Sequence, residues 1–254
     1  LKDIKINTNN LYVISDFDNT ITDFNSHGSL NVITKSQLLG EEYYNRYLKI
    51  VDEYEEKAKN TTDIKLKKEL WFKHLSEYMK MLKKYNLTKD LLENIIKTSN
   101  IKFRKNFDVF IKYLYSKNIP LIIISSGLGN SIEIFLKMNN LYYDNIYIIS
   151  NFVEFGENGN IIDIPKNVIT PVTKNEIIFN DEINLLINEK KNKIIFGDIP
   201  DDICMSKINE YQNTLSISFC NYNYMLDELC NKFDFVIKDG NIFKLLEDII
   251  SEDK

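Results

Sequence analysis

Six short apolar runs are spaced along the chain, and each has the length of a β-strand. They are LYVIS (11–15), PLIIIS (120–125), IYIIS (146–150), KIIF (193–196), LSISF (215–219) and FVIK (235–238). Continuous hydrophobicity is typical of strands that are covered on both faces, as in a parallel sheet. Helical patterns such as NFDVFIKYLYSKN and SIEIFLKMNN lie between the runs. This alternation predicts an α/β fold with a Rossmann-like open parallel sheet.

The segment between the first two runs has a different pattern. It lacks strand signals, and the apolar residues of TKSQLLGEEYYNRYLKIVDEYEEKAK and IKLKKELWFKHLSEYMKMLKK recur at helical spacing. Thr88 is placed to cap a further helix over KDLLENIIK. We therefore predict a helical cap domain over 25–101, inserted after the first strand into a core domain made of 1–24 and 102–254.

A β-hairpin is expected in the stretch NFVEFGENGNIID, residues 151–163. Two short extended runs flank Asn158 and Gly159, which are residue types that accept a positive φ. The pattern predicts that both residues adopt that conformation in the turn.

Composition limits the kinds of function that this chain can have. Its 254 residues, 44% hydrophobic, can form a core domain with a large insertion. A formal net charge of −5 argues against a general binder of polymeric nucleic acid. No apolar run is long enough to cross a membrane, and three widely spaced cysteines match neither a disulfide framework nor a zinc site. We expect a cytoplasmic protein without a membrane partner.

Two carboxylates, Asp16 and Asp18, follow the first apolar run in the stretch DFDNT. If the backbone stays extended through Phe17, both side chains lie on the same side, where their charges repel unless a cation or proton intervenes. In open α/β sheets ligands bind at this carboxyl end of the strands. The alternative is a solvated strand end followed by an Asp-Asn-Thr turn.

Three more polar clusters lie further along the chain, two of them directly after predicted strands and one, Lys174, between the predicted hairpin and a predicted helix. They are Ser125-Ser126-Gly127 after PLIII, Lys174 in TPVTKNE, and Asp198 with Asp201 and Asp202 in GDIPDD. Hydroxyl and backbone N–H groups before a helix can bind a phosphate, so Ser125 and Ser126 form a candidate phosphate site. Each cluster also has a purely structural alternative: a serine-capped turn, a solvated lysine, or a turn rich in helix-capping acids.

The combination of these clusters has a chemical reason. Asp16, Asp18 and Asp198 can converge in a cleft only with a cation, and oxygen donors select a hard ion such as Mg2+. With its charge neutralised by Mg2+ and Lys174, a phosphate ester could be attacked by a carboxylate to give an aspartyl phosphate. Phosphoryl transfer needs mainly positioning and charge stabilisation, which this set supplies.

The ordered set DFDNT, SSG, Lys174 and GDIPDD resembles the four motifs of the haloacid dehalogenase (HAD) superfamily of phosphohydrolases. The stretches DFDNTITDF, NIPLIIISSGLGNSIEIFL, IISNFVEFGENGNI and IIFGDIPDDICMSK are most similar to the cytosolic pyrimidine 5'-nucleotidase family, also called type III. The resemblance implies a HAD core with a helical cap and a Mg2+-dependent phosphomonoesterase acting on nucleoside 5'-monophosphates. A phosphatase for phosphoserine or another small metabolite phosphate is the alternative. A catalytically silent module would have lost a motif carboxylate, and none is lost.

The resemblance also implies a role for each matching residue. Asp16 would be the nucleophile, and Asp18 would be the general acid and base. Ser125 and Lys174 would bind the phosphate, and the Asp16 carboxylate, the Asp18 backbone carbonyl and Asp198 would bind Mg2+. Asp202 would stabilise these ligands without touching the ion, or bind it through a water.

Aromatic residues of the predicted cap are candidates for stacking a base. We select Tyr47, Tyr54 and Trp71, because flat aromatic faces bind flat rings. Core packing is the alternative, since aromatic residues at helical spacing commonly form a buried stripe. The neighbouring Glu53, Glu55 or Glu56 could accept hydrogen bonds from a base, or these glutamates belong to a solvated face. The cap is where this sequence departs from the family's pattern, so the base preference stays open.

Overall fold

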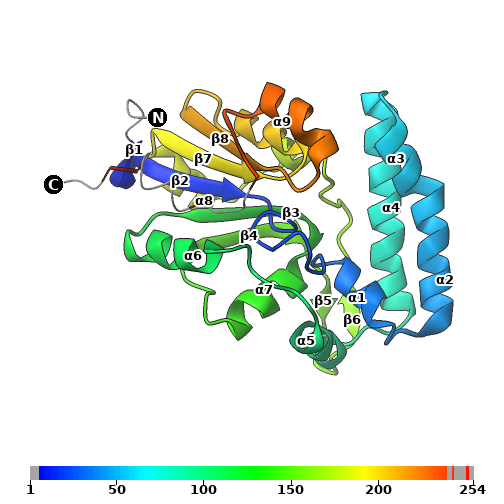
Figure 1. Ribbon diagram of the computed structural model, residues 1–254. Coiled ribbons are helices and arrows are strands. Elements are labelled where there is room, and N and C mark those ends of the chain that lie inside the picture. Colours follow the sequence, from blue (N-terminus) through cyan, green and yellow to red (C-terminus); the bar gives the residue numbers. More distant parts are fainter. Residues whose placement is uncertain (1–5, 239–241, 243–249, 252–254) are drawn as a thin grey trace.

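The computed structural model describes residues 6–238, 242 and 250–251. Its centre is a six-stranded sheet in the order β4-β3-β2-β7-β8-β9, with parallel pairing throughout (Figure 1). The strands are β2 (Leu11–Ser15), β3 (Leu121–Leu128), β4 (Ile146–Asn151), β7 (Asn192–Gly197), β8 (Asn213–Phe219) and β9 (Phe235–Ile237). All six predicted strands are present. The predicted α/β fold with an open parallel sheet is confirmed.

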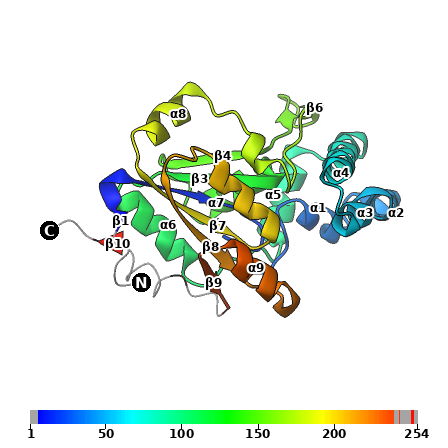
Figure 2. The ribbon, with the colours of Figure 1, turned by 90° about the horizontal axis from the view of Figure 1, so that it is seen from above.

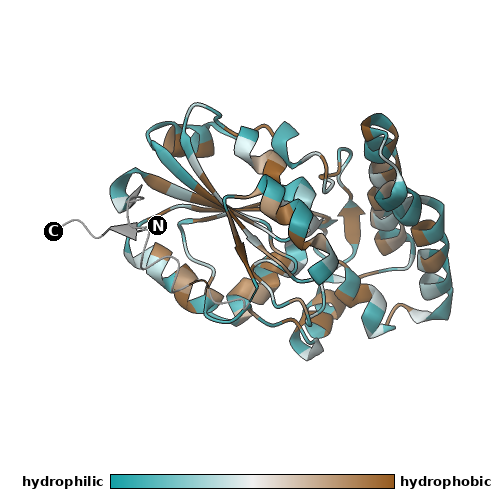
Figure 3. Ribbon diagram, turned by 45° about the horizontal axis from the view of Figure 1, so that its top comes forward, coloured by the Kyte–Doolittle hydropathy of each residue, from teal (hydrophilic) through white to brown (hydrophobic). Residues whose placement is uncertain are grey.

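Helices cover both faces of this sheet. One face packs on α6 (Phe107–Ser116) and α7 (Gly129–Met138), and the other packs on α8 (Asp181–Asn188) and the 3-10 helix η4 (Pro200–Lys207) (Figure 2). Successive side chains of β2 alternate between the layers: Val13 belongs to the first cluster and Ile14 to the second. Burial on both faces explains why the strands are continuously apolar. Figure 3 shows this hydrophobic sheet beside the more polar helices of the inserted segment.

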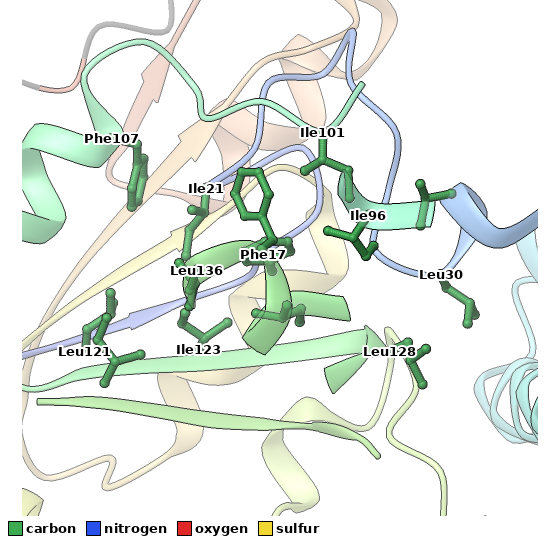
Figure 4. Packing of buried hydrophobic residues seen from close by; sticks show 14 of the residues in the cluster. Phe17, Ile21, Leu30, Ile96, Ile101, Phe107, Leu121, Ile123, Leu128 and Leu136 are labelled. Carbon is green, nitrogen blue, oxygen red and sulfur yellow. The ribbon is translucent and has the colours of Figure 1, made fainter. Parts of the chain in front are cut away.

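The residues that follow β2 continue the larger cluster towards the inserted segment. Phe17 and Ile21 lie near Ile96 and Ile101, with Leu30 further out (Figure 4). Phe17 and Ile21 are fully buried. Apolar contacts therefore hold the turn between the first strand and the insertion.

The insertion is helical, as predicted. It contains α1 (Asn31–Ser36), α2 (Gly40–Ile50), the π-helical turn η2 (Val51–Glu55), α3 (Glu56–Asn60), α4 (Ile64–Lys84) and α5 (Lys89–Thr98). Thr88 Oγ1 accepts a hydrogen bond from the Leu91 N–H at 3.2 Å, which confirms the predicted cap of α5. In Figure 1, α2, α3 and α4 stand beyond the carboxyl ends of the strands. The domain boundaries at residues 24 and 101 stay a prediction.

The predicted hairpin is formed by β5 (Glu154–Phe155) and β6 (Ile161–Asp163) in antiparallel pairing. The prediction for its turn is half wrong. Gly159 has a positive φ of +76°, as predicted, but Asn158 does not have a positive φ. The Asn158 side chain instead accepts a hydrogen bond from the Asn160 N–H at 3.1 Å. This local bond stabilises the turn, so one glycine is enough.

Shorter elements complete the described chain. They are β1 (Ile6–Asn7) paired with β10 (Ile250–Ser251), the 3-10 helices η1 (Thr8–Asn10), η3 (Lys174–Glu176) and η5 (Asn223–Met225), and α9 (Leu226–Lys232). Cys204, Cys220 and Cys230 are free thiols, as predicted. Within the described ranges, none of the helices has the length and apolar character to cross a membrane.

Candidate active site

The loops after β2 and β7 bring the first two acidic clusters together. The sheet register pairs Ser15 with Phe196, and the Asp16 N–H donates to the Phe196 carbonyl at 3.0 Å. The two adjacent parallel strands therefore end at nearly the same level. This register places Asp16 and Asp198, each just beyond its strand, at one edge of the sheet.

Lys174 is buried between two carboxylates, with 2% of its surface exposed. Its Nζ donates to Asp16 Oδ1 at 2.5 Å and to Asp202 Oδ1 at 2.6 Å. Burial alone lowers the pKa of an ammonium, but the two carboxylates raise the pKa of Lys174 above its ordinary value. The lysine is therefore cationic, and the alternative of a solvated lysine is wrong.

Asp16, Asp198 and Asp202 form a compact acidic cluster. One oxygen from each carboxyl lies within 4.8 Å of the others, and all three residues are buried. Burial raises the pKa of Asp16 to about 7 even though Lys174 opposes the shift, and burial together with Asp202 raises the pKa of Asp198 well above its usual range. Such shifts mark carboxylates that gain from a cation. An all-oxygen donor set of this kind fits Mg2+.

Asp202 is held by the backbone as well as by Lys174. Its Oδ2 accepts from the N–H groups of Asp198 at 3.0 Å and Ile199 at 3.2 Å. Because Oδ1 already pairs with Lys174, the carboxyl connects the lysine to the loop that presents Asp198. These contacts are compatible with a role in supporting the metal ligands. One Asp202 oxygen also lies close enough to the other two carboxyls to bind a cation itself.

Ser29, in the segment leading to α1, fixes the carboxylate of Asp18. The Ser29 N–H donates to Asp18 Oδ1 at 2.6 Å, and its hydroxyl donates to Oδ2 at 2.7 Å. Burial raises the pKa of Asp18, and both hydrogen bonds oppose that rise. Gly127 packs against this pair so closely that a Cβ atom there would lie 1.9 Å from Ser29 Oγ. Ser29 could not be identified from the sequence, because the stretch around it has no pattern that points to Asp18, eleven residues earlier.

The two serines after β3 differ in exposure and in contacts. Ser125 is buried, and its Oγ accepts a hydrogen bond from the Gly127 N–H at 3.0 Å. This bond is the kind that the alternative of a serine-capped turn predicts. Ser126 is half-buried, and its carbonyl accepts from Asn151 Nδ2 at 2.9 Å. An added Cβ on Gly127 would contact both Ser125 Oγ and Asp18, which places Ser125 beside the catalytic candidates. Phosphate binding by the serines stays a prediction.

Asn151, from the stretch SNF, is a structural residue that sequence reasoning did not identify. Its amide nitrogen donates to the carbonyls of Ser126 and Ile169, and its Oδ1 accepts from the Ile169 N–H at 2.7 Å. The side chain thereby ties the end of β3 to the segment that leads to Lys174. A buried asparagine with all these contacts fixes two loops of the site at once.

The predicted base-stacking residues lie in different environments. The Tyr47 ring packs edge-on against Tyr78, with centroids 5.6 Å apart, and Tyr54 is half-buried against the core cluster. Trp71 is half-buried in α4, its ring lies edge-on to His74 at 5.7 Å, and its Nε1 has no hydrogen-bond partner among the described residues. Of the three, Trp71 is therefore the one with a buried polar atom that lacks a partner among the described residues.

Glu55 lies in the π-helical turn next to these residues. Its carboxylate is 2.7 Å from Lys59 Nζ and 3.4 Å from Nε2 of the buried His74. It is therefore part of a polar cluster inside the cap and does not belong to a solvated face. π-Helical turns are frequent at functional sites, so Glu55 stays a candidate for substrate contact, and His74 of α4 joins it through their contact.

Comparison with known proteins agrees with this geometry. A family model described as "Pyrimidine 5'-nucleotidase (UMPH-1)" matches residues 14–252. The 7-methylguanosine phosphate-specific 5'-nucleotidase A of Xenopus laevis is 26% identical over 241 residues, covering 89% of this chain and 82% of the relative. The crystal structure of cytosolic 5'-nucleotidase IIIB bound to cytidine superposes with a TM-score of 0.81 at 22% identity, covering 94% of this chain and 84% of that one. A phospho-aspartyl intermediate analogue of phosphoserine phosphatase gives 0.59 at 20% identity, covering 95% and 99%.

The fold and these matches define a phosphoric monoester hydrolase built on the HAD fold. Within that class, the chain belongs to the pyrimidine 5'-nucleotidase family. Both levels of the resemblance inferred from the motifs are therefore confirmed.

Proposed function

We propose that this chain is a Mg2+-dependent 5'-nucleotidase that hydrolyses nucleoside 5'-monophosphates through an aspartyl phosphate on Asp16. The observation that carries the proposal is the buried contact of Lys174 with Asp16 and Asp202 inside the acidic cluster. A lysine there supplies positive charge where a dianionic phosphate has to approach carboxylates. We also propose a cytoplasmic location, which the description of the similar solved enzyme as cytosolic supports.

The proposed reaction has two displacements at phosphorus. In the first, an Asp16 carboxylate oxygen forms a bond to phosphorus while the bond to the 5' oxygen of the nucleoside breaks, and Asp18 donates its proton to that oxygen. In the second, Asp18 accepts a proton from a water whose oxygen attacks phosphorus, and the bond to Asp16 breaks. Lys174 neutralises phosphate charge in both steps.

The protein's own residues prepare these steps. Ser29 orients the Asp18 carboxylate, and the raised pKa of Asp18 suits a group that must be protonated in one step and ionised in the next. Asp16, Asp198 and the backbone carbonyl of Asp18 would hold Mg2+, which neutralises the phosphate and orients it. Ser125 and Ser126 would bind the remaining phosphate oxygens.

For the substrate, the printed names of the relatives favour a nucleotide. The family is described as acting on pyrimidine nucleotides, the Xenopus laevis relative is named for 7-methylguanosine phosphate, and the solved neighbour contains cytidine. We propose that Trp71 stacks the base, with Tyr47 and Tyr54 as further contacts. The unpaired Trp71 Nε1 and the adjacent His74 and Glu55 supply polar groups in the same part of the cap.

The test is a comparison of phosphate release from different esters by the purified protein, with and without Mg2+. We expect CMP, UMP and 7-methyl-GMP to be hydrolysed with a higher kcat/KM than phosphoserine or sugar phosphates. EDTA should abolish activity, and added Mg2+ should restore it. Equal turnover of all esters, or a preference for phosphoserine, would contradict the nucleotidase assignment and favour the metabolite phosphatase.

A further inference from the structure

Arg104 is a buried cation that the proposed reaction does not use. It lies just past the insertion, with 5% of its surface exposed, and its guanidinium stacks over the Phe219 ring at 4.1 Å. Burying a charge is costly unless hydrogen bonds compensate, so its partners matter. Burial lowers the pKa of Arg104 to about 10, which leaves it cationic at neutral pH.

The partners of Arg104 are carbonyl groups of the loop that follows Asp18. Its Nε donates to the Thr20 carbonyl at 2.8 Å, and one terminal nitrogen donates to the Asn19 carbonyl. Asn19 has a φ of +60°, a conformation that asparagine accepts more readily than other side chains. The planar guanidinium thus fixes two consecutive carbonyls of the turn immediately after the proposed acid and base.

Asn221, two residues beyond the end of β8, connects this arginine to the acidic cluster. Its Oδ1 accepts from Arg104 at 2.9 Å, and its Nδ2 donates to Asp198 Oδ2 at 3.1 Å and to the Asn19 carbonyl at 3.0 Å. An amide that accepts on one side and donates on the other has a single orientation here. From the other side, the Thr20 hydroxyl lies 3.4 Å from Asp198 Oδ1.

We propose that Arg104 and Asn221 are positioning residues, which hold the Asp198 carboxylate and the Asn19–Thr20 turn in place for Mg2+ without contacting the substrate. This inference rests on the proposed metal role of Asp198. Partners that orient a metal ligand tune affinity for the metal strongly. Arg104 also brings a second positive charge towards three carboxylates that Lys174 neutralises only in part.

Asn221→Ala tests the inference, and the matched control is Asn223→Ala, which changes an exposed asparagine two residues further on, at the start of η5. We expect Asn221→Ala to bind Mg2+ about tenfold or more weakly by isothermal titration calorimetry. Half-maximal activity should require correspondingly more Mg2+, while the KM for the nucleotide at saturating Mg2+ stays close to that of the control. Arg104→Lys keeps the charge but loses the planar guanidinium with its several N–H donors, and it should also weaken Mg2+ binding.

The outcomes separate this inference from the proposed function. Circular dichroism should show that Asn221→Ala melts like the Asn223→Ala control, and the test then does not depend on whether Arg104→Lys folds. If the wild type needs Mg2+ and Asn221→Ala binds it equally well, the positioning role is wrong and the function stands. If the wild type neither binds Mg2+ nor releases phosphate, both proposals fall.

Discussion

Ser29 donates two hydrogen bonds to Asp18, one to each carboxylate oxygen, at 2.6 and 2.7 Å. The serine belongs to the segment that leads into the cap, while Asp18 belongs to the core motif. The start of the insertion therefore orients the group that we propose as general acid and base.

Replacing Ser29 with alanine removes the hydroxyl bond and leaves the backbone bond. A hydrogen bond to a charged group contributes about 1.5–3 kcal/mol, so we expect kcat to fall by roughly tenfold or more, with a smaller change in KM. Because the hydroxyl lowers the pKa of Asp18, its loss should raise that pKa and move the acidic limb of the kcat profile to higher pH. Ser26→Ala is the control, and pH–rate profiles that coincide for the two variants would refute the role of Ser29.

Two ion pairs join α4 of the cap to the loops of the active site. Lys67 contacts Asp201 at 2.9 Å, next to Asp202, and Lys68 contacts Glu176, two residues after Lys174. Exposed pairs contribute little stability, but like charges at these positions would repel. We expect Lys67→Glu with Lys68→Glu to open the cap, increase the radius of gyration in solution scattering and lower kcat/KM.

Lys73→Glu is the matched control for that experiment, because Lys73 pairs within α4, with Glu69, and not with the core. A phosphate analogue should reduce the radius of gyration of the wild type, since closure excludes water around the leaving group. If scattering and hydrogen exchange do not respond to the analogue, the cap does not close over the substrate and this prediction is wrong.

Trp71 is the cap residue for which we expect the largest effect on nucleotide binding. Trp71→Ala should raise the KM for CMP by about tenfold, because base stacking on an aromatic ring contributes roughly 1–3 kcal/mol. The KM for a small ester such as p-nitrophenyl phosphate should change little, since that substrate has no base to stack. Phe72→Ala, which removes an exposed ring from the same helix, is the control. Equal KM changes for both substrates would argue for core packing.

Lys193 lies outside the active site, and it makes the free energy of unfolding depend on pH. Its buried Nζ donates to the carbonyls of Ser206 at 2.7 Å, Ile208 and Asn209 at the end of η4. Lys193→Met leaves these carbonyls without their donor and should cost about 1–3 kcal/mol in the free energy of unfolding at pH 7.

The pH dependence of that difference has a definite sign. Burial lowers the pKa of Lys193 from 10.5 to about 8, so between these values the unfolded chain binds more protons than the folded one. The contribution of Lys193 to stability is therefore smallest below pH 8 and increases as pH rises from about 8 to 10.5, so the cost of Lys193→Met should grow over this window. Denaturant unfolding of both proteins at several pH values measures it, and parallel pH curves for wild type and variant would contradict it.

The sequence was informative where chemistry follows directly from a strand. Asp16 and Asp198 could be proposed because each follows a buried run, and Lys174 could be proposed from its place in the motif order. Ser29, Arg104 and Asn221 could not, because their contacts depend on how distant segments pack. Arg104 and Asn221 are 117 positions apart in the chain.

The contacts of the cap residues were equally hard to predict from the sequence. Its helices and the Thr88 cap followed from periodicity, but helical spacing does not reveal which aromatic side chain is available to a ligand. The hydroxyl of the buried Tyr43 bonds to Tyr78, whereas Trp71 keeps an unpaired Nε1. The turn at Asn158 departed from prediction because a side-chain hydrogen bond replaced a second positive φ.

The most direct test of the account is mass spectrometry of enzyme quenched with acid during turnover of a nucleoside monophosphate. We predict one phosphoryl group on the peptide that contains Asp16 in the wild type. Asp16→Asn should keep the fold by circular dichroism but show neither the phosphoryl group nor turnover. Turnover by Asp16→Asn, or a phosphoryl group on a different residue of the wild type, would contradict the assignment of Asp16 as the nucleophile.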